Sequence, residues 1–378
     1  MVMNKELRNV ANVNNKTDEP IIKLNSEKGV VFSPYDGASY AHHAFISFFK
    51  GKFYACFSCG FKNEDDCGQS VMLSTSLDGL SWSKPTAIVT PSAFNEPKAV
   101  LTASGFYSDG EVLSLYFGYF KYAKIGDDGY RLAVDAHHTD TQLFVLRTRD
   151  GITWEKPIGL NLPVVANHPP QLTSSGRLII SGSIVFPYTD NKNGVDGWKM
   201  PGIYGNAFMG GKVFDDSESI HLVTKANGFD CNLICEGSFF ESNGVIRMLL
   251  RSNSNYMWIS ESYDNGENWT RPQKTDFTNA NAKFHFGKIE KNKFYCINNA
   301  SLTGDRYPLN LHLSLDGINF NKTYILRDEH YDMQFSGLFK GGCYAYPHSI
   351  IHDGYLYVIY SMKKERIEVT KLSLDELK

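Results

Sequence analysis

Glu236 and Arg251 are the two charged residues around which the most chemically suggestive part of the sequence is arranged. Glu236 precedes an alternating run, and Arg251 ends the run that follows it, residues 245–251. A carboxylate and a guanidinium on neighbouring strands either form a structural ion pair or together hold an anionic ligand. We favour the second role for Arg251, because an arginine at the far end of a strand projects toward the edge where ligands bind.

Histidines and tyrosines supply further groups that can transfer protons. His42 and His43 open a strand, so one of the two must face the core, and the sequence leaves open which one. Tyr119 and Tyr122 lie in the run YFGYFKY, either as a catalytic base or as ordinary loop aromatics. The remaining candidates are His137, His168, His285, Arg306, Tyr346 and His348.

Several common catalytic signatures are missing from the sequence. It contains no glycine-rich phosphate loop, no nucleophile-elbow serine and no H-E-x-x-H zinc motif. Hydrolysis between two carboxylates needs a second acid to act with Glu236, and the run Glu64-Asp65-Asp66 is the candidate that we find for it.

Two sets of residues resemble metal ligands only weakly. Cys231 and Cys235 have a C-x₃-C spacing, but a four-ligand zinc site needs two further partners. Asp127, Asp128 and Asp135 are the acidic residues of a long loop. We interpret the first set as core thiols and the second as a solvated loop. The sequence therefore requires no cofactor, although it leaves room for a structural calcium or zinc ion.

Short alternating apolar runs predict the β-strands that would position these groups. They cover residues 44–49, 52–57, 112–117, 143–147, 177–181, 294–298 and 355–360. No amphipathic helix longer than about ten residues is predicted, so the fold class is all-β. The segments 118–138 and 186–204 are longer loops that carry Tyr, His and Asp, and long loops on a rigid scaffold often hold the functional residues.

A recurring turn sets the repeat of the chain. Ser262 to Trp269 fits the Asp-box pattern S-x-D-x-G-x-x-W, in which the Asp carboxylate accepts backbone N–H groups and the Trp packs beneath the loop. Related turns contain Asp78, Asp150 and Asp316. The interval from Asp150 to Asp264 is about twice the expected repeat, which predicts a degenerate repeat between them. The period is typical of a propeller blade of four strands.

Composition narrows the class of protein. The 378 residues carry a formal charge of −3, which argues against a nucleic-acid binder, and 13% are aromatic, as suits strands and sugar-stacking surfaces. Seven cysteines are an odd number, best read as reduced thiols. No signal or transmembrane segment is visible in this chain. We expect a periplasmic or secreted protein if a signal has been removed, and a cytoplasmic one otherwise.

The Asp boxes together with CEGSFFESNGVIRMLLRS resemble the sialidase superfamily. More narrowly, three segments resemble the Asp-box polysaccharide lyases and their relatives: YAHHAFISFFKGKFYACFS, NANAKFHFGKI and KGGCYAYPHSIIHDGYLYVIYSMKKERIEV. That group includes ulvan lyases and enzymes that cleave rhamnose from a 4-linked glucuronate. The resemblance runs from about Tyr40 to the C-terminus and implies a seven-bladed β-propeller, while the spacing alone allows six blades or seven.

The sialidase resemblance implies an arginine triad that grips the substrate carboxylate, a tyrosine nucleophile and a glutamate that partners the tyrosine. The residues that match the second arginine, the third arginine, the glutamate and the tyrosine are Arg251, Arg306, Glu236 and Tyr346. His42 and His43 stand where the first arginine would be, and Asp65 or Asp66 matches the acid aspartate only loosely. A true sialidase is therefore disfavoured.

The lyase resemblance implies a histidine from the first blade, a tyrosine from the second and a cation after it. His42 or His43 fits the first, Tyr119 or Tyr122 the second, and His137 stands where an arginine is expected. Such residues serve β-elimination at a uronic acid, in which the carboxylate charge is offset and a Tyr or His takes the C5 proton. The histidines expected to line the channel and bind substrate are His168, His285 and His348.

We therefore expect a tail over residues 1–25 and a single propeller domain over residues 26–378. The expected function is a lyase that cleaves next to glucuronic acid, in a rhamnose-glucuronate or ulvan-like linkage. Two alternatives stay open: a glycoside hydrolase on the same scaffold, rhamnosidase or sialidase-like, and a non-catalytic glycan-binding propeller. The expected partner is an acidic glycan, with no nucleic acid and no membrane, and the expected state is a monomer.

Overall fold

The computed structural model describes residues 10–134, 136–182, 185–203, 234–270 and 272–377. Strands dominate these residues, which contain no α-helix and two short 3₁₀ turns, η1 (Pro91–Phe94) and η2 (Leu374–Leu377). No helix in the described ranges is long and apolar enough to cross a membrane. The all-β prediction is confirmed.

The described strands form six sheets of three to five strands and one two-stranded ribbon. The first sheet contains β3 (Tyr40–Phe49), β4 (Lys52–Gly60), β5 (Ser70–Ser76) and β6 (Thr86–Val89). The second contains β7 (Val100–Ser108), β8 (Leu113–Tyr122), β9 (His138–Thr148) and β10 (Ile158–Gly159). The third contains β11 (His168–Leu172), β12 (Leu178–Ser181) and β13 (Tyr188–Thr189).

The later sheets follow the same antiparallel order. The fourth contains β15 (Ile234–Ser242), β16 (Val245–Ser252), β17 (Tyr256–Ser262) and β19 (Gln273–Thr278). The fifth contains β20 (His285–Glu290), β21 (Lys293–Asn298), β22 (Leu309–Ser314) and β23 (Lys322–Arg327), extended by β1 (Ile22–Lys23). The sixth contains β24 (Tyr344–His352), β25 (Tyr355–Met362), β26 (Arg366–Ser373) and β2 (Glu27–Phe32). The ribbon pairs β14 (Gly202–Ile203) with β18 (Asn268–Trp269).

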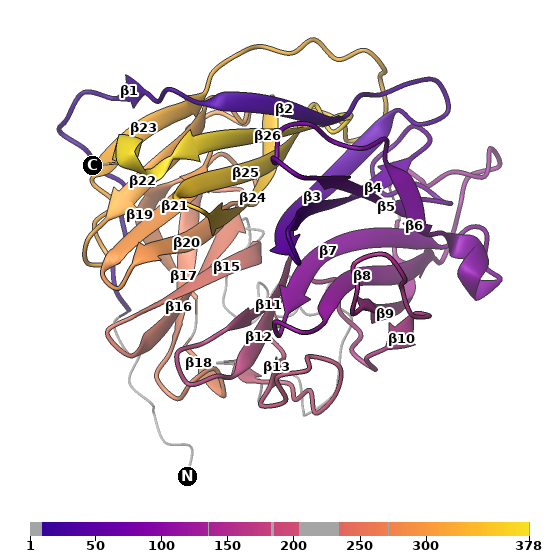
Figure 1. Ribbon diagram of the computed structural model, residues 1–378, viewed down its shortest axis with the longest axis horizontal. Coiled ribbons are helices and arrows are strands. Elements are labelled where there is room, and N and C mark those ends of the chain that lie inside the picture. Colours follow the sequence, from indigo (N-terminus) through magenta and orange to yellow (C-terminus); the bar gives the residue numbers. More distant parts are fainter. Residues whose placement is uncertain (1–9, 135, 183–184, 204–233, 271, 378) are drawn as a thin grey trace.

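The six sheets fan out around a common centre, which their first strands β3, β7, β11, β15, β20 and β24 face (Figure 1). Consecutive first strands lie next to one another, except that the third sheet meets β15 through β12. Six large clusters of buried apolar side chains fill the spaces between neighbouring sheets, including the space between the sixth and the first. The core is therefore distributed between sheets, because each sheet buries both faces against its neighbours.

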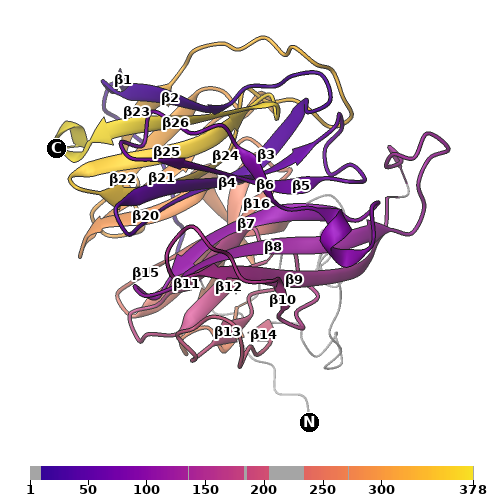
Figure 2. The ribbon, with the colours of Figure 1, turned by 45° about the vertical axis from the view of Figure 1, so that its right-hand side comes forward.

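The N-terminal segment completes two sheets near the C-terminus. β2 pairs antiparallel with β26, and β1 pairs parallel with β23 (Figure 2). Further upstream, Val13 is buried and Asn14 bridges to Asn319 and Asp276. Of the expected tail, residues 10–25 thus lie against the fourth and fifth sheets; the division into tail and domain stays a prediction.

All four Asp-box turns follow the third strand of their sheet. In the first, Asp78 Oδ1 accepts the backbone N–H groups of Leu80 at 2.8 Å and Ser81 at 2.7 Å, and Ser76 Oγ donates to it at 2.9 Å. Trp82 Nε1 donates to the Gly79 carbonyl at 3.1 Å. The equivalent carboxylates are Asp150, Asp264 and Asp316. The repeat found in the sequence is therefore a turn that locks the outer strands of four sheets.

Removing one such carboxylate is expected to weaken the fold. Backbone N–H groups of Asn319 and Ile318 outweigh the effect of burial and lower the pKa of Asp316 to about 2. Because this pKa is depressed, the stabilisation is present above the ordinary Asp pKa and is lost as the pH falls toward 2. We expect Asp316→Ala to lower the unfolding free energy by about 2 kcal/mol at neutral pH. Urea denaturation against the exposed-site variant Asp332→Ala measures this, and equal stability of the two would contradict it.

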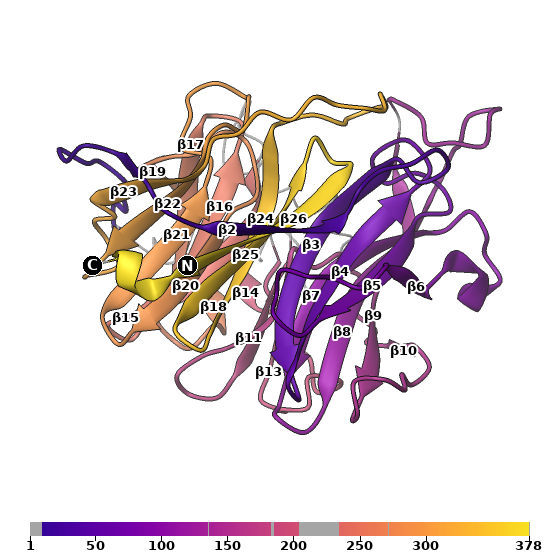
Figure 3. The ribbon, with the colours of Figure 1, turned by 45° about the horizontal axis from the view of Figure 1, so that its top comes forward.

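β-Bulges at the beginning of three first strands turn side chains toward the centre. The pairing register shifts between His42 and Phe45 in β3, and in the corresponding parts of β15 and β24. Each bulge holds one non-glycine residue with a left-handed backbone: His43 (φ 51°), Glu236 (φ 51°) and Tyr346 (φ 56°). This conformation costs about 1 kcal/mol or more per residue and is typical of functional sites. Figure 3 shows β3 and β24 running side by side.

Candidate active site

The bulges of β24 and β15 bring Tyr346 and Glu236 together with Arg251 at the end of β16. The Tyr346 hydroxyl donates to Glu236 Oε1 at 2.6 Å and accepts from Arg251 Nη1, also at 2.6 Å. The same Arg251 nitrogen pairs with Glu236 Oε2, and Arg251 Nε donates to Asn281 Oδ1 at 2.8 Å. The tyrosine oxygen is therefore held between a proton acceptor and a cation.

The charges of this group fix the resting protonation states of Glu236 and Tyr346. Burial on its own would raise the pKa of Glu236, but Arg251, the Tyr346 hydroxyl and Lys283 outweigh burial and lower it. Burial raises the pKa of Tyr346 well above its usual range, although Arg251 opposes this. At neutral pH Glu236 is thus an ionised base that faces a protonated tyrosine.

Arg306 adds a second guanidinium to the group. Its central carbon lies 5.6 Å from the centre of the Tyr346 ring, and its Nη2 donates to the Asn281 carbonyl at 3.2 Å. Its Nη1 is buried and has no hydrogen-bond partner within the described residues. A buried cationic donor without a partner costs free energy, so a ligand oxygen is its natural acceptor.

His42 and His43 both contact Tyr346, His42 as a fully buried residue and His43 as a half-buried one. Their ring centres lie 4.1 Å and 5.5 Å from the Tyr346 ring centre. Burial, helped by the charge of Lys283 and partly opposed by Glu64, lowers the pKa of His43 to about 3. Burial and His43 lower the pKa of His42 well below its usual range. Both rings are therefore neutral at physiological pH.

Glu64 is the carboxylate of the Glu64-Asp65-Asp66 run that reaches this site. Its Oε1 lies 4.0 Å from His42 Nε2, and its Oε2 accepts from Lys364 Nζ at 2.6 Å. Asp65 and Asp66, which matched the acid aspartate only loosely, accept hydrogen bonds from their own loop: Gln69 Nε2 donates to Asp65 and the Asn63 amide to Asp66. Those two carboxylates hold the loop in shape, while Glu64 lies beside His42.

A family model described as a BNR repeat-like domain matches residues 130–358, more than half of the chain. The chain belongs to the BNR repeat-like domain family. This confirms the broader resemblance that the Asp boxes indicated. A search of the curated proteins with this chain found no match.

Solved structures share the fold of this BNR repeat-like chain at low sequence identity. A protein of unknown function from Dyadobacter fermentans DSM 18053 is 16% identical, with a TM-score of 0.63 over 92% of this chain and 98% of that one. Trypanosoma rangeli sialidase in complex with sialic acid is 14% identical (TM-score 0.62), and a mutant of NanB sialidase from Streptococcus pneumoniae is 13% identical (TM-score 0.64). The matches cover 94% and 92% of this chain but 60% and 71% of those chains.

Lys283 is a residue of the Tyr346 group that the sequence reasoning did not select. It is 1% exposed, donates from Nζ to the Asn167 carbonyl at 2.8 Å, and lies 5.1 Å from the Tyr346 ring centre. Burial lowers its pKa to about 7, against the opposing charge of Glu236. Lys283 lies two residues before β20, so strand alternation gave no signal for it.

Lys283 is expected to make stability depend on pH. Its folded pKa of about 7 lies below the ordinary value of 10.5, so unfolding takes up a proton between these values and stability rises with pH across that window. We expect Lys283→Met to be more stable than wild type by about 2 kcal/mol near pH 6 and to lack this rise. Urea midpoints from pH 6 to 9 test this, with exposed Lys288→Met as the control. A slope that persists in Lys283→Met would contradict it.

Three of the predicted catalytic residues lie outside the Tyr346 group. Tyr119 packs in the core against Phe94 and Phe144, with ring centres 5.1 Å and 5.9 Å away. The Tyr122 hydroxyl donates to the Asp65 carbonyl at 2.8 Å. His137 is exposed, and its backbone carbonyl accepts from Ala123. The contacts described here for Tyr119 and Tyr122 do not include His42 or His43, and the proton-transfer role expected of Tyr119 or Tyr122 stays a prediction.

The three remaining histidines form a separate buried cluster. His168, His285 and His348 have ring centres 4.5 to 6.1 Å apart. Burial lowers the pKa of His285 to about 3 and takes the pKa of His168 and His348 well below the usual range. His348 lies on β24, as Tyr346 does, but its ring lies in the histidine cluster and not in the Tyr346 group.

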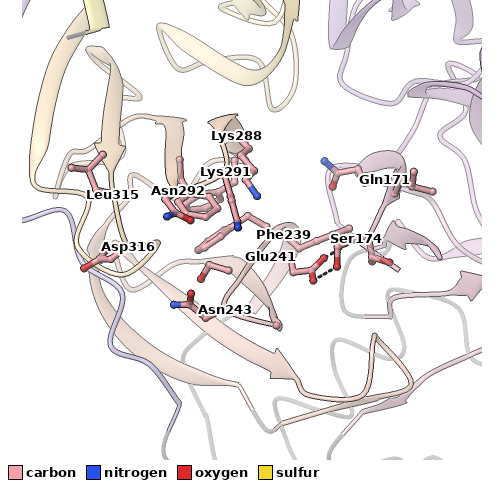
Figure 4. A pocket seen from close by; sticks show the side chains of 18 residues that line it. Gln171, Ser174, Phe239, Glu241, Asn243, Lys288, Lys291, Asn292, Leu315 and Asp316 are labelled. Atoms are coloured by element: carbon pink, nitrogen blue, oxygen red, sulfur yellow. Dashed lines mark hydrogen bonds between the residues drawn. The ribbon is translucent and has the colours of Figure 1, made fainter. Parts of the chain in front are cut away.

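A pocket lies at the ends of the strands opposite to the Tyr346 group. It holds about 710 Å³ between the third, fourth and fifth sheets, where Ser174 donates to Glu241 and the side chains of Lys288 and Lys291 extend from the β20–β21 hairpin (Figure 4). No predicted site residue lines it. It is therefore a different region of the surface from the Tyr346 group.

The weak metal-ligand sets gain no support. Cys231 and Asp135 lie outside the described residues, and Cys235 is a buried cysteine that forms no disulfide within the described chain. The carboxylate of Asp128 accepts from the Tyr130 backbone, as in an ordinary turn. Within the described chain, the groups with a spacing suited to a metal are His42–His43–Glu64 and His168–His285–His348.

Proposed function

We propose that this chain is a glycoside hydrolase that removes an acidic sugar from a glycan, with Tyr346 as its nucleophile. The observation that carries the proposal is the Tyr346 hydroxyl, which donates to Glu236 while it accepts from Arg251, both at 2.6 Å. A tyrosine attacks carbon only when a base takes its proton as the bond forms. Glu236 is that base, and Arg251 stabilises the developing phenolate.

The surrounding charges favour a carboxylated sugar. Arg251, Arg306, Lys283 and Lys364 surround two carboxylates, Glu236 and Glu64, so the site is more basic than acidic. The unpartnered Arg306 Nη1 is the donor we assign to the sugar carboxylate.

The chemistry then takes two steps. The Tyr346 oxygen bonds to the anomeric carbon, the glycosidic bond breaks, and the leaving oxygen takes a proton. Water later attacks the glycosyl-tyrosine, and Glu236 returns the proton to Tyr346. We assign this proton exchange to Glu64: once its ion pair with Lys364 opens, Glu64 takes a proton from solvent, gives it to the leaving oxygen, and takes one back from the attacking water. A Trypanosoma rangeli sialidase structure holds 2,3-difluorosialic acid as a covalent intermediate, which is consistent with this route.

For the scaffold we propose a six-bladed propeller rather than the seven blades first expected. The support is the set of six sheets whose clusters pack each one against the next, from the first round to the sixth. In this arrangement β2 closes the last blade.

A second candidate is the lyase acting next to glucuronate, in a rhamnose-glucuronate or ulvan-like linkage. The observation that favours it is the pair of neutral imidazoles, His42 and His43, against Tyr346. An imidazole that donates a hydrogen bond to the uronate carboxylate offsets its charge, and Tyr346 then moves the proton in place of Tyr119 or Tyr122.

One experiment separates these functions. The purified protein is incubated with a fluorogenic sialoside, a fluorogenic glucuronide, ulvan and a rhamnose-capped glucuronate glycan, while released sugar and ultraviolet absorbance are followed. Released sugar without absorbance supports the hydrolase, and absorbance of an unsaturated uronate supports the lyase. For the hydrolase, a 2,3-difluoro sugar acid is expected to add one sugar mass to the peptide containing Tyr346. Saturable binding with neither product would leave a glycan-binding protein and overturn both enzymes.

A further inference from the structure

Three histidines from three different sheets converge in the centre of the molecule. His168 begins β11, His285 begins β20, and His348 lies inside β24. They are 0%, 4% and 7% exposed, and one ring nitrogen from each lies within 4.8 Å of the others. We infer that these three imidazoles bind one divalent transition-metal ion. The inference is independent of the chemistry proposed for Tyr346.

The hydrogen bonds of His168 leave one nitrogen ready to bind a metal. Its Nε2 lies 3.0 Å from the Phe284 carbonyl oxygen, which can only accept, so the ring proton is on Nε2. Nδ1 then carries a lone pair, and it is buried with no partner within the described residues. A histidine held through one nitrogen by a carbonyl, with the other nitrogen bare, is the arrangement of a metal ligand.

The other two rings are held in a similar way. His285 Nδ1 lies 2.8 Å from Ser349 Oγ, which is itself 3.0 Å from the Tyr295 hydroxyl. His348 Nδ1 accepts from the Ile46 backbone N–H at 3.4 Å. That bond is long, so moving the proton of His348 to free a nitrogen for the metal gives up little. Each ring is thus oriented by a partner outside the cluster.

The separations of the rings match those around a single ion. The ring centres of His168 and His285 are 5.3 Å apart, those of His285 and His348 are 4.5 Å apart, and those of His168 and His348 are 6.1 Å apart. Tetrahedral zinc with bonds of about 2.1 Å to three imidazoles places their centres roughly 5 Å apart. Small rotations of the rings therefore suffice, and no strand has to move.

A cavity leaves room for a fourth ligand. About 390 Å³ of space is lined by His285, His348, Ser349 and Gln171, and the Gln171 Oε1 atom is buried without a partner in the described structure. Gln171 and Lys288 also line the larger pocket of Figure 4. Three protein nitrogens and one open position form a site at which water or a small anion completes the coordination.

Imidazole selects zinc, copper, nickel and cobalt over magnesium and calcium. Lys283 carries a positive charge near all three rings, and this charge opposes a second cation. Three imidazole ligands with one open position are typical of zinc, so we assign zinc as the ion. We use Co²⁺ as the probe because it absorbs visible light.

The test is a Co²⁺ titration of the intact protein by visible absorption, with the metal bound after dialysis counted by elemental analysis. Wild type is expected to bind one equivalent and to unfold at a higher temperature when loaded. His168→Gln and His285→Gln are each expected to bind at least tenfold more weakly and to show no thermal shift. The matched control is His312→Gln: His312 is a buried histidine of the fifth sheet, but both its nitrogens are bonded, to Thr323 and Asn298 at 2.9 Å.

Each outcome decides the proposal. Loss of binding in folded His168→Gln and His285→Gln, with retention in His312→Gln, supports it. Retention in all variants, or loss in His43→Gln alone, would place the metal at His42–His43–Glu64 or on the surface and overturn it. Azide is expected to change the visible spectrum of the cobalt-loaded protein, and an unchanged spectrum would overturn the open fourth position. Should either variant fail to fold, His348→Gln takes its place in the same comparison.

Discussion

Tyr346→Phe is expected to lower turnover of the acidic glycoside by about 10³-fold or more. The change removes the oxygen that would attack the anomeric carbon and leaves the ring in place against His42 and His43. Glu236 and Arg251 remain paired with each other, so the variant is expected to fold and to bind ligand. Turnover and ligand affinity, measured on the same preparation, distinguish loss of chemistry from loss of binding.

Tyr122→Phe is the matched control for this variant. Tyr122 is also a buried tyrosine on a strand, and its hydroxyl makes one hydrogen bond, to the Asp65 carbonyl at 2.8 Å. Its loss is expected to cost about 1 kcal/mol of stability and to leave turnover unchanged. If Tyr122→Phe were inactive and Tyr346→Phe active, the base would be the tyrosine first expected from the lyase resemblance, and the nucleophile assignment would be wrong.

Arg251→Met is expected to destabilise the fold by about 3–5 kcal/mol at neutral pH. Glu236 would keep its buried position and lose the cation that holds its pKa below the usual range. With Arg251 present, that depressed pKa contributes stability above the ordinary Glu value, which is lost as the pH falls. In Arg251→Met burial is expected to dominate and raise the pKa, so stability should instead increase as the pH falls toward 5.

Two further variants test whether the stability lost in Arg251→Met comes from the buried charge that is left without a partner. The double variant Arg251→Met/Glu236→Gln is expected to recover much of the lost stability, because no buried charge remains without a partner. Arg247→Met removes the partner of buried Glu261, 3.0 Å away in the same sheet, and is expected to lower stability while leaving turnover unchanged. Urea denaturation at pH 5 and pH 7 measures both. Failure of the double variant to recover would show that Arg251 stabilises the fold by packing rather than by charge.

Local patterns in the sequence were sufficient to predict the all-β fold class and many of its strands and turns. Alternating runs predicted strands such as β4, β16 and β25, and the Asp boxes marked turns that now stand after the third strand of four sheets. These features depend on residues close together in the chain, so they can be read without the fold. The grouping of Tyr346 with Glu236 and Arg251 was predicted from the family resemblance. Tyr346 is far from the other two in sequence, so no local pattern links them.

The parts of the site that sequence reasoning missed depend on burial. Lys283 reads as an ordinary surface residue until the sheets close over it, and its lowered pKa follows from that closure. The sequence named the whole run Glu64-Asp65-Asp66 as the candidate for a second acid, because only the loop conformation decides which of the three neighbouring carboxylates points inward. Tyr122 was selected for its residue type, but its hydroxyl was already satisfied by a backbone carbonyl.

The pairing of β2 with β26 has a consequence for folding during synthesis. Glu27 lies opposite Lys371, so β2 can form its pairing only after β26, near the end of the chain, has been synthesised. Contacts of such high sequence separation slow folding, and until they form β26 is an open sheet edge able to pair with other chains. Removing residues 27–32 should therefore give a protein that aggregates before it loses most of its other sheets.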